Sequence, residues 1–538
     1  MFRAKKRLYC CFVDLKKAFD TLRRDYLFLK LYIQGINGNL VNLIKDMYKN
    51  VTYSIKLESG LTDPFCSNIG VKQGCILSPL LFNLFMNDFP NRLGSNCEPI
   101  TIGDTTCNCL MYADDIILIS QSQEGLQNCL STLALYCKEW NLKVNTEKTQ
   151  AMVFNKTGKL LKNVNLLYDN TPIKTVQEYK YLGLLMRASG SFTNAVDNLK
   201  KKALKVIFLI KRKFQSHRNN SQLMLKLFDS CVKPVLIYGS ELWGPYILNL
   251  DKKLTSDKNN ALEDSFLSFI PEKIHIGFCK FVLGVNKYAS NIASMAELGR
   301  YPISISVILQ SIKYWLYLFK DSDNNGKLAS RTAECIDETC PSSYNKHILE
   351  LLKTMGFIHV WNNKGTTSEG KLVYALRKKF EERYNKYFFS ILSSDDNNKL
   401  RTYNTLKKEY KPETYTQLNV PRQHIKLLSK LRISNHNLEI ERGRYNKTPP
   451  NERLCKSCKA NKIEDEFHFI CECDLFENSR NLFFKDISEM VFEFRNFNIL
   501  EKFKYLMNAS ETDVLIRFFS FLEDCMNTRN SSEGVARS

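Results

Sequence analysis

The chain has 538 residues, 44% of them hydrophobic and 25% charged, which is enough to bury the cores of about two to four globular domains. Lys and Arg outnumber Asp and Glu by 77 to 56, and the resulting formal charge of +21 favours a polyanionic partner, although a basic protein can also simply be well solvated. The chain contains no run of about eighteen apolar residues and no signal-peptide core, so we expect an intracellular protein, nuclear or cytoplasmic, that is neither secreted nor membrane-spanning.

The first predicted element is a buried strand that ends on an acidic residue. Residues 8–13 form a continuous apolar run, and Asp14 follows it directly. A helix with apolar positions between residues 22 and 33 comes next. Asp20 lies where the N-cap of that helix is expected, and we favour this capping role over a chemical one.

A hairpin and a glycine-flanked loop are predicted next along the chain. Residues 51–69 alternate like two strands joined at a Ser-Gly turn, and they lead into residues 70–74, which begin and end with glycine. Two glycines allow close approach of the backbone to a ligand, and Gln73 between them can bond a base or sugar edge, although glycines also flank ordinary turns. Ser78, followed by a proline, then predicts the cap of a helix.

Two adjacent carboxylates, Asp114 and Asp115, lie between the apolar runs 110–112 and 116–119. The pattern predicts a strand, a tight turn and a second strand with the acidic pair at the tip. Such a pair can simply form a surface turn. Together with Asp14, however, the two acids match a site that holds two divalent cations about 3.5–4 Å apart for phosphoryl transfer, because Mg²⁺ needs only a few carboxylates besides substrate phosphates.

Three ordered motifs resemble the palm of reverse transcriptases from non-LTR, LINE-type retrotransposons. They are Phe12–Asp20, Gly70–Phe82 and Tyr112–Asp115. The resemblance implies an RNA-directed DNA polymerase, a nucleotidyltransferase that uses Mg²⁺ or Mn²⁺, an RNA template, a DNA primer or target DNA, and deoxynucleoside triphosphates. It also implies an α+β fold: a right-hand palm made of an antiparallel sheet with packed helices, a helical thumb and a mostly helical remainder.

The resemblance further implies roles for single residues. Asp14, Asp114 and Asp115 would hold the catalytic metals, and Lys148 would donate a proton to the leaving pyrophosphate, although a solvated lysine is an open alternative. Phe19 would be a steric gate against a ribose 2′-hydroxyl, where the bare sequence suggests only a core residue. The remaining expected contacts are Gly70, Gln73, Gly74 and Tyr112 with nucleotide or template, and Tyr181, Leu182 and Gly183 as the grip on the primer end.

The rest of the chain reads as mostly helical. Residues 126–140 and 192–214 repeat apolar positions at helical spacing, and the second segment carries seven basic residues between 200 and 213, as expected of a thumb that follows a phosphate backbone or of a solvated face. Polar breaks at 321–326 and 395–398 suggest boundaries. We therefore predict four domains: a palm with partial fingers at 1–190, a thumb and helical connection at 191–320, a basic helical region at 326–445 and a zinc-binding-like module at 446–538.

Most of the 18 cysteines lie scattered in apolar segments, which indicates reduced thiols, but one C-terminal group is different. Cys455, Cys458, His468 and Cys473 supply four ligands of the kind that a closed tetrahedral Zn²⁺ site uses. Cys471 competes for the fourth place, and we prefer Cys473 because this spacing recurs at the end of similar elements. Reduced cysteines in a small helical core are the alternative.

The chain also departs from the family pattern. Only thirteen residues precede Asp14, so most of the fingers are missing and we expect an N-terminally truncated copy. The rival reading is a catalytically inactive, nucleic-acid-binding remnant with a zinc knuckle. An RNA-dependent RNA polymerase is a lesser rival, disfavoured by Tyr112–Asp115 and by Phe19. The sequence leaves the oligomeric state open.

Overall fold

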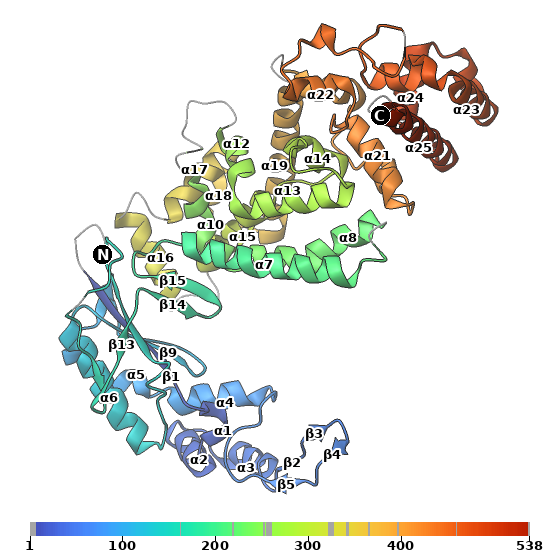
Figure 1. Cartoon of the computed structure of the whole chain (residues 1–538). Helices are drawn as coiled ribbons and strands as arrows, with labels where there is room; N and C mark the ends of the chain where they lie inside the picture. Colours follow the sequence, from blue (N-terminus) through green and yellow to red (C-terminus); the bar gives the residue numbers. More distant parts are fainter. Residues whose placement is uncertain are drawn as a thin grey trace. The chain divides into compact units, whose positions relative to one another are not determined.

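The computed structural model describes residues 7–161, 163–217, 220–250, 253, 261–320, 328–339, 344–363, 366–394, 398–458 and 460–535 (Figure 1). The chain divides into two units, which are described one at a time. Unit 1 comprises Met1–Ala195 and Asn325–Thr339, and unit 2 comprises Val196–Asn324 and Cys340–Ser538. The predicted boundary at 321–326 and most of the one at 395–398 lie outside the described residues.

Unit 1 is built on a five-stranded sheet with the order β13-β10-β1-β9-β8. The strands are β1 Leu8–Asp14, β8 Cys109–Tyr112, β9 Asp115–Ser120, β10 Gln150–Phe154 and β13 Lys174–Thr175. All neighbours are antiparallel except β10 and β13. The strand predicted at 8–14 and the acidic hairpin are therefore confirmed, and β1 is the central strand.

Both faces of this sheet are covered, which explains the continuous apolar run in β1. Cys11 and Val13 pack into a core shared with the helices of unit 1, whereas Cys10 and Phe12 face a second core that includes Met186. The helices are α1 Ala18–Thr21, α2 Arg24–Ile33, α3 Gly38–Met47, α4 Leu77–Met86, α5 Phe89–Arg92, α6 Gln123–Glu139 and α16 Leu328–Thr339. Alternate residues of one strand thus anchor two layers.

Small hairpins complete unit 1. The hairpin predicted at 51–69 is confirmed but is divided into an outer and an inner pair. The short strands are β2 Thr52–Tyr53, β3 Lys56–Leu57, β4 Gly60–Leu61, β5 Phe65–Cys66, β6 Ile100–Ile102, β7 Thr105–Cys107, β11 Leu167–Tyr168, β12 Thr171–Pro172, β14 Glu178–Tyr181 and β15 Leu184–Arg187.

Two predicted helix caps are wrong. Asp20 lies inside α1, and α2 begins only at Arg24 without a side-chain cap. The Asp20 carboxylate instead accepts a hydrogen bond from Nε2 of Gln73 at 2.6 Å. Ser78 lies inside α4, and its hydroxyl donates to the carbonyl of Lys72 at 2.5 Å. In both cases a residue of the 70–74 loop is the hydrogen-bond partner of a side chain that the sequence had assigned to a helix cap.

The described part of unit 2 is helical. Its helices are α7 Thr193–Lys213, which starts at the end of unit 1, α8 Ser221–Leu227, α9 Lys233–Leu236, α10 Ser240–Leu248, α12 Ala261–Ser268, α13 Ile270–Leu283, α14 Asn291–Glu297, α15 Ile303–Leu318, α17 Tyr344–Met355, α18 Ile358–Asn362, α19 Glu369–Leu392, α20 Arg401–Leu406, α21 Arg422–Arg432, α22 Glu439–Tyr445, α23 Glu477–Met490, α24 Ile499–Met507 and α25 Thr512–Val535. The long helix predicted at 192–214 is confirmed as α7. Nowhere in the described ranges does a helix reach the length and apolar character needed to cross a bilayer.

A buried ion cluster joins separate segments of unit 2. Arg432 at the end of α21 and Glu297 at the end of α14 are both fully buried, and Nη2 of Arg432 lies 3.1 Å from Oε1 of Glu297 and 3.0 Å from Oε2 of Glu413. Burial alone would raise the pKa of Glu297, but the charges of Arg432 and Lys407 outweigh it and lower this pKa. Tyr415 also donates its hydroxyl to Glu297. We call these five residues the Arg432 cluster.

The residues after Glu297 pack closely against the segment around Pro412 and Glu413. Gly299 has a φ of +60°, and a Cβ at this position would lie 2.5 Å from Cδ of Pro412. Leu298 forms a β-bridge with Pro412, and the amide of Glu413 donates to the carbonyl of Glu297 at 2.9 Å. The sequence suggested only helices with tight turns here, whereas the structure shows a junction between the segments around 297 and 412.

Arg432→Met should lower the free energy of unfolding by about 3–5 kcal/mol, because it leaves the buried carboxylate of Glu297 and the partly buried one of Glu413 without their main cation. Guanidinium chloride unfolding followed by circular dichroism measures this loss. Arg517→Met is the matched control, since the Arg517 side chain is 56% exposed and lies 3.9 Å from Asp486, and an exposed pair of this kind contributes about 1 kcal/mol or less. Equal losses in the two variants would show that the Arg432 cluster does not hold unit 2 together.

Candidate active site

Three carboxylates meet at one end of the central strand of unit 1. β1 runs antiparallel to β9, so its last residue, Asp14, is paired directly with Asp115, the first residue of β9. Asp114 precedes Asp115 in the tight turn, where Ala113 adopts a φ of +55°. The strand register therefore brings together acids that are about a hundred positions apart in the sequence.

The three carboxylates repel one another in this arrangement. Burial, and then the charges of Asp114 and Asp14, raise the pKa of Asp115 above its usual range. All three side chains are only partly buried, and that of Asp14 is 34% exposed, so a ligand can still reach them. A divalent cation would relieve this repulsion, and carboxylate oxygens are the ligands that Mg²⁺ prefers.

Residues 145–149 brace the carboxylate end of β1. The amide of Asn145 donates to the carbonyl of Asp14 at 2.8 Å, and the amide of Asp14 donates to Oγ1 of Thr149 at 3.2 Å. Lys148 lies on the same turn, with Nζ 4.0 Å from Oδ2 of Asp14 and a side chain that is 70% exposed. The predicted proton donor is thus beside the carboxylates but is not held firmly by them.

The loop that contains Gly70, Gln73 and Gly74 lies against the segment that follows β1. The amide of Gly70 donates to the carbonyl of Leu22 at 2.8 Å, and the amide of Val71 donates to that of Phe19 at 2.8 Å. The Phe19 ring is half-buried and stacks on a phenylalanine of α4, with 5.0 Å between the ring centroids. Phe19 therefore belongs partly to the core.

The buried Arg24 was not expected from the sequence. Its guanidinium donates four hydrogen bonds, at 2.8 to 3.1 Å, to the carbonyls of Tyr48, Ser67, Ile69 and Gly70. Arg24 thereby fixes both ends of the 51–69 hairpin and the start of the glycine-flanked loop. Nothing in the local pattern identifies this role, because an arginine near the start of a helix is usually solvated.

The predicted primer-grip residues form the turn between β14 and β15. Leu182 and Gly183 both have positive φ, and Tyr181 ends β14. Tyr179, two residues earlier, stacks on Phe12 of β1 with a centroid distance of 4.2 Å. Burial, and then the charge of Asp115, raise the pKa of Tyr181 to about 12. This hairpin therefore packs on the strand that carries Asp14, and its tyrosines lie within electrostatic reach of the acids. The other predicted contact, Tyr112, is exposed at the end of β8.

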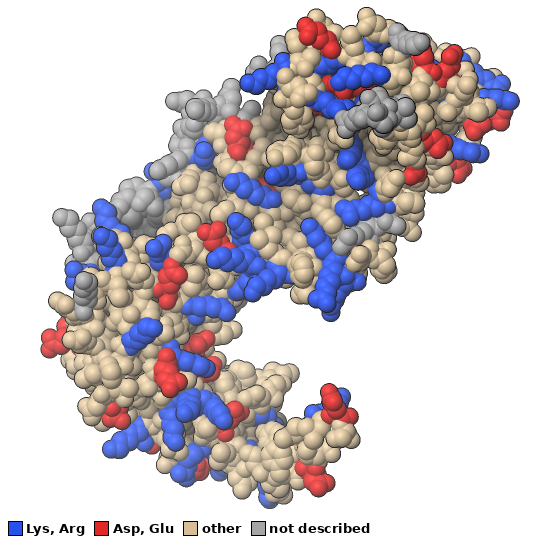
Figure 2. Space-filling view, in the orientation of Figure 1, with Lys and Arg blue, Asp and Glu red and all other residues tan. Residues whose placement is uncertain are grey.

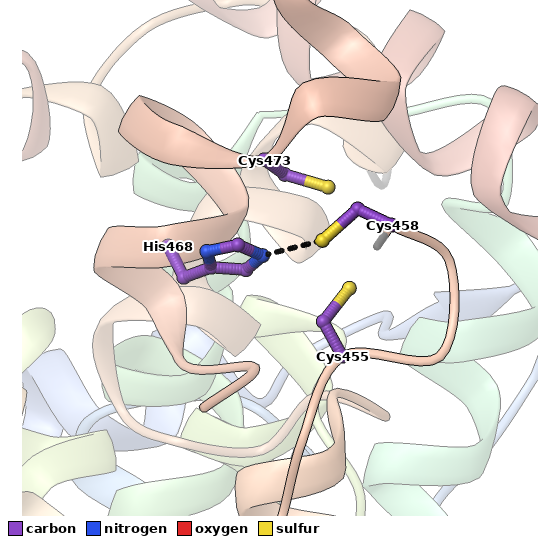
Figure 3. A group of neighbouring side chains, drawn as sticks. All are labelled: Cys455, Cys458, His468 and Cys473. Carbon is purple, nitrogen blue, oxygen red and sulfur yellow. Dashed lines mark hydrogen bonds between the residues drawn. The ribbon is translucent and has the colours of Figure 1, made fainter. Parts of the chain in front are cut away.

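The C-terminal cysteines and histidine form a second candidate site, in unit 2. The ligand atoms of Cys455, Cys458, His468 and Cys473 all lie within 4.8 Å of one another, and Figure 3 shows the sulfur atoms and the imidazole pointing toward one centre. Cys471 does not belong to this group. It packs in the core, and burial raises the pKa of its thiol to about 12.

The chemistry of this donor set is compatible with zinc. Three thiols and one imidazole are the ligands of structural zinc sites. Hydrogen bonding to Cys473 lowers the pKa of Cys455, which favours the thiolate form that binds a metal. Nε2 of His468 faces the sulfur of Cys458 at 3.4 Å, and Nδ1 lies 3.6 Å from Oε2 of Glu472.

Comparison with known proteins identifies the class of unit 1. Residues 1–186 match the family model described as "Reverse transcriptase (RNA-dependent DNA polymerase)". This match covers 186 of the 538 residues, and the expected resemblance to the enzymes of non-LTR retrotransposons is confirmed by the relatives.

The curated relatives are proteins of mobile elements. The chain is 27% identical over 249 residues to "Probable RNA-directed DNA polymerase from transposon BS" of Drosophila melanogaster, covering 44% of this chain and 26% of that protein. It is 26% identical over 247 residues to "RNA-directed DNA polymerase from mobile element jockey" of the same organism, covering 43% and 25%. The chain thus spans about a quarter of the length of these relatives. Among solved structures, telomerase from Candida tropicalis matches with a TM-score of 0.27 and 14% identity, covering 62% of this chain and 50% of that one.

Gly70→Ala should destabilise unit 1 more than Gly74→Ala. Both glycines have φ near +80°, so alanine costs about 1–2 kcal/mol of backbone strain at either position. A Cβ at Gly70 would also lie 2.6 Å from the carbonyl oxygen of Asp20, whereas nothing lies within 4 Å at Gly74. We expect a total cost of about 2–5 kcal/mol at Gly70, measured by chemical denaturation. Indistinguishable costs would contradict the close contact between the loop and α1.

Proposed function

We propose that the chain acts as an RNA-directed DNA polymerase that adds deoxynucleotides to a primer 3′-hydroxyl. The proposal rests on one observation above all: within a reverse transcriptase domain, Asp14, Asp114 and Asp115 meet at the end of paired strands.

In the proposed reaction, the primer 3′-oxygen attacks the α-phosphorus of the triphosphate and the bond to the β-phosphate breaks. Asp14 and Asp114 would hold one divalent cation, and Asp115 would help to hold the second from the turn. Two such cations, when bound, lower the pKa of the 3′-hydroxyl and neutralise the charge on the triphosphate. Lys148 donates a proton to the leaving pyrophosphate, and its exposed side chain beside Asp14 suits that role.

The remaining predicted contacts surround this centre. Phe19, held by its stack on α4, presents a ring edge that discriminates against a ribose 2′-hydroxyl. The turn at residues 181–183 grips the primer end, and its packing on β1 supports that position. The contacts assigned to nucleotide or template are Gly70, Gln73, Gly74 and Tyr112.

The proposed division of the chain follows from these roles. Residues 1–190 form the palm with partial fingers, and residues 191–320 form the thumb and its helical connection. The basic face of α7 follows the phosphate backbone of the template and primer. Residues 326–445 are a basic helical region, and residues 446–538 carry the zinc-binding module.

Asp114→Ala should reduce deoxynucleotide incorporation on an RNA template with a DNA primer by at least about a thousandfold, a rise of about 4 kcal/mol in the barrier. Binding of the RNA should be unchanged or slightly tighter, because a negative charge is removed. Asp104→Ala is the control, since Asp104 is an exposed acid in a neighbouring hairpin of the same unit. Primer extension with Mg²⁺ or Mn²⁺, beside a binding titration, measures both effects.

Each outcome of this experiment has a defined meaning. Incorporation by the wild type and the Asp104 variant, but not by the Asp114 variant, supports the polymerase. RNA binding without incorporation by the wild type supports the inactive remnant instead. Preferential use of ribonucleotides over deoxynucleotides would favour an RNA-dependent RNA polymerase and would contradict the role given to Phe19.

We also propose that Cys455, Cys458, His468 and Cys473 hold a structural Zn²⁺. Cys473→Ser should abolish stoichiometric zinc in the purified protein and lower the melting temperature of unit 2, because ligand binding energy contributes to folding. Cys471→Ser removes a thiol of the same core outside the group and should retain the zinc. Metal analysis by mass spectrometry measures the content, and zinc loss in the Cys471 variant alone would reassign the fourth ligand.

A further inference from the structure

A basic groove lies on the surface of unit 2, formed by α13, the turn after it and α21. Its volume is about 530 Å³, and none of the described residues that line it is acidic. The name "basic groove" refers here to the lining residues Lys273, Ile276, Lys280, Phe281, Lys287 and Arg422. Four of these six carry a positive charge, so the groove concentrates positive potential with no carboxylate of its own to neutralise it.

Two of the four cations are held by hydrogen bonds, and the other two are exposed. The Lys280 side chain is 8% exposed, and its Nζ donates to the carbonyl of Lys287 at 2.8 Å and to Oδ1 of Asn291 at 2.7 Å. Arg422 donates to the carbonyl of Phe281. Lys273 and Lys287 are exposed. The groove therefore has a floor of hydrogen-bonded cations and exposed cationic rims, which suits an extended anion.

The wall of the groove is closed by a tight approach of two helices. Gly284, just after α13, has a φ of +70°, and a Cβ there would lie 2.9 Å from Cβ of Lys426 on α21. Lys426 is exposed and adds another positive charge next to the lining residues. Figure 2 shows Lys and Arg side chains gathered over this part of unit 2, where α7, α13 and α21 lie in Figure 1. The positive surface therefore extends beyond what a single phosphate would need.

The aromatic ring in the groove is not available for stacking on a base. Nζ of Lys211, on α7, lies 4.1 Å from the centroid of the Phe281 ring, and the guanidinium carbon of Arg422 lies 4.5 Å from it. Cations therefore already occupy the positions over the ring that a nucleobase would take. The other polar side chain of the groove, Asn291, already accepts from Lys280. These contacts leave positive charge as the main feature of the groove, without an open aromatic face.

We propose that the basic groove binds the phosphodiester backbone of a nucleic acid strand and does not read its bases. The reverse transcriptase domain in the same chain favours a nucleic acid over an anionic membrane surface as the ligand. The proposal is independent of catalysis, because a chain with an inactive palm would still carry this groove.

The test compares two double charge reversals in the full chain. Lys273→Glu/Lys287→Glu changes the exposed rims of the groove, and Lys371→Glu/Lys379→Glu changes exposed lysines of α19 that do not line it. Fluorescence anisotropy with labelled single-stranded RNA and duplex DNA, without divalent metal or nucleotide, gives the affinity across a salt series. We expect the groove variant to bind at least about tenfold more weakly, with a shallower salt dependence, and equally so for mixed and homopolymeric strands.

The control variant changes the net charge by the same amount but away from the groove. It should therefore lose clearly less affinity. Equal losses in the two variants, or a loss confined to one base composition, would overturn the proposal. The neutral pair Lys273→Gln/Lys287→Gln, checked for folding by thermal melting, should show a smaller loss in the same direction. Binding of the wild type to anionic lipid vesicles, abolished in the groove variant while nucleic acid binding persists, would reassign the groove to a membrane. Primer extension by the groove variant at saturating template separates this result from any failure of the catalytic site.

Discussion

The central strand β1 is paired along both edges and covered on both faces, and this constraint determines where chemistry can occur in unit 1. A charged group inside such a strand would have no solvent and no partner. The end of the strand is the first position at which a carboxylate can remain ionised, and Asp14 occupies it. Antiparallel pairing then places the start of β9 opposite that end, so the same register that buries Cys11 against Leu118 brings Asp115 to Asp14.

The two units use buried or half-buried charge in opposite ways. In unit 2, Glu297 meets Arg432 in a fully buried pair, so its charge is compensated and serves to join helices. In unit 1, the nearest recorded cation to Asp14 is the exposed Lys148 at 4.0 Å, and burial, followed by the charges of Asp114 and Asp14, raises the pKa of Asp115. Compensated charge stabilises a fold, whereas uncompensated charge that stays accessible creates a demand for a cation. This contrast supports the assignment of the carboxylates to metal binding.

The parts of the fold that follow from local patterns could be predicted from the sequence. Apolar runs and helical spacing located β1, the acidic hairpin and α7, and the order of motifs located the acids. Residues whose partners are distant in the chain could not be found in this way. Arg24 bonds Gly70 across 46 positions, and Arg432 bonds Glu297 across 135. Asp20 was misassigned as a cap for the same reason, since Gln73, 53 positions away, donates to it. Ser78 was misassigned because its hydroxyl donates back to Lys72, six positions earlier, instead of capping the helix.

The basic residues illustrate the same limit on reading charge from sequence. The run between residues 200 and 213 is conspicuous because its lysines are neighbours in the chain. The basic groove is not, because Lys273, Lys287 and Arg422 come from separate turns and only the approach of α13 to α21 makes them one surface. The sequence shows how charges are spaced along the chain, whereas the binding of a phosphate backbone depends on how they are arranged in three dimensions. The positive electrostatic potential of the groove is produced by tertiary packing, and no acid is among its described lining residues. It is therefore a stronger indication of an anionic ligand than a run of lysines on one solvated helix.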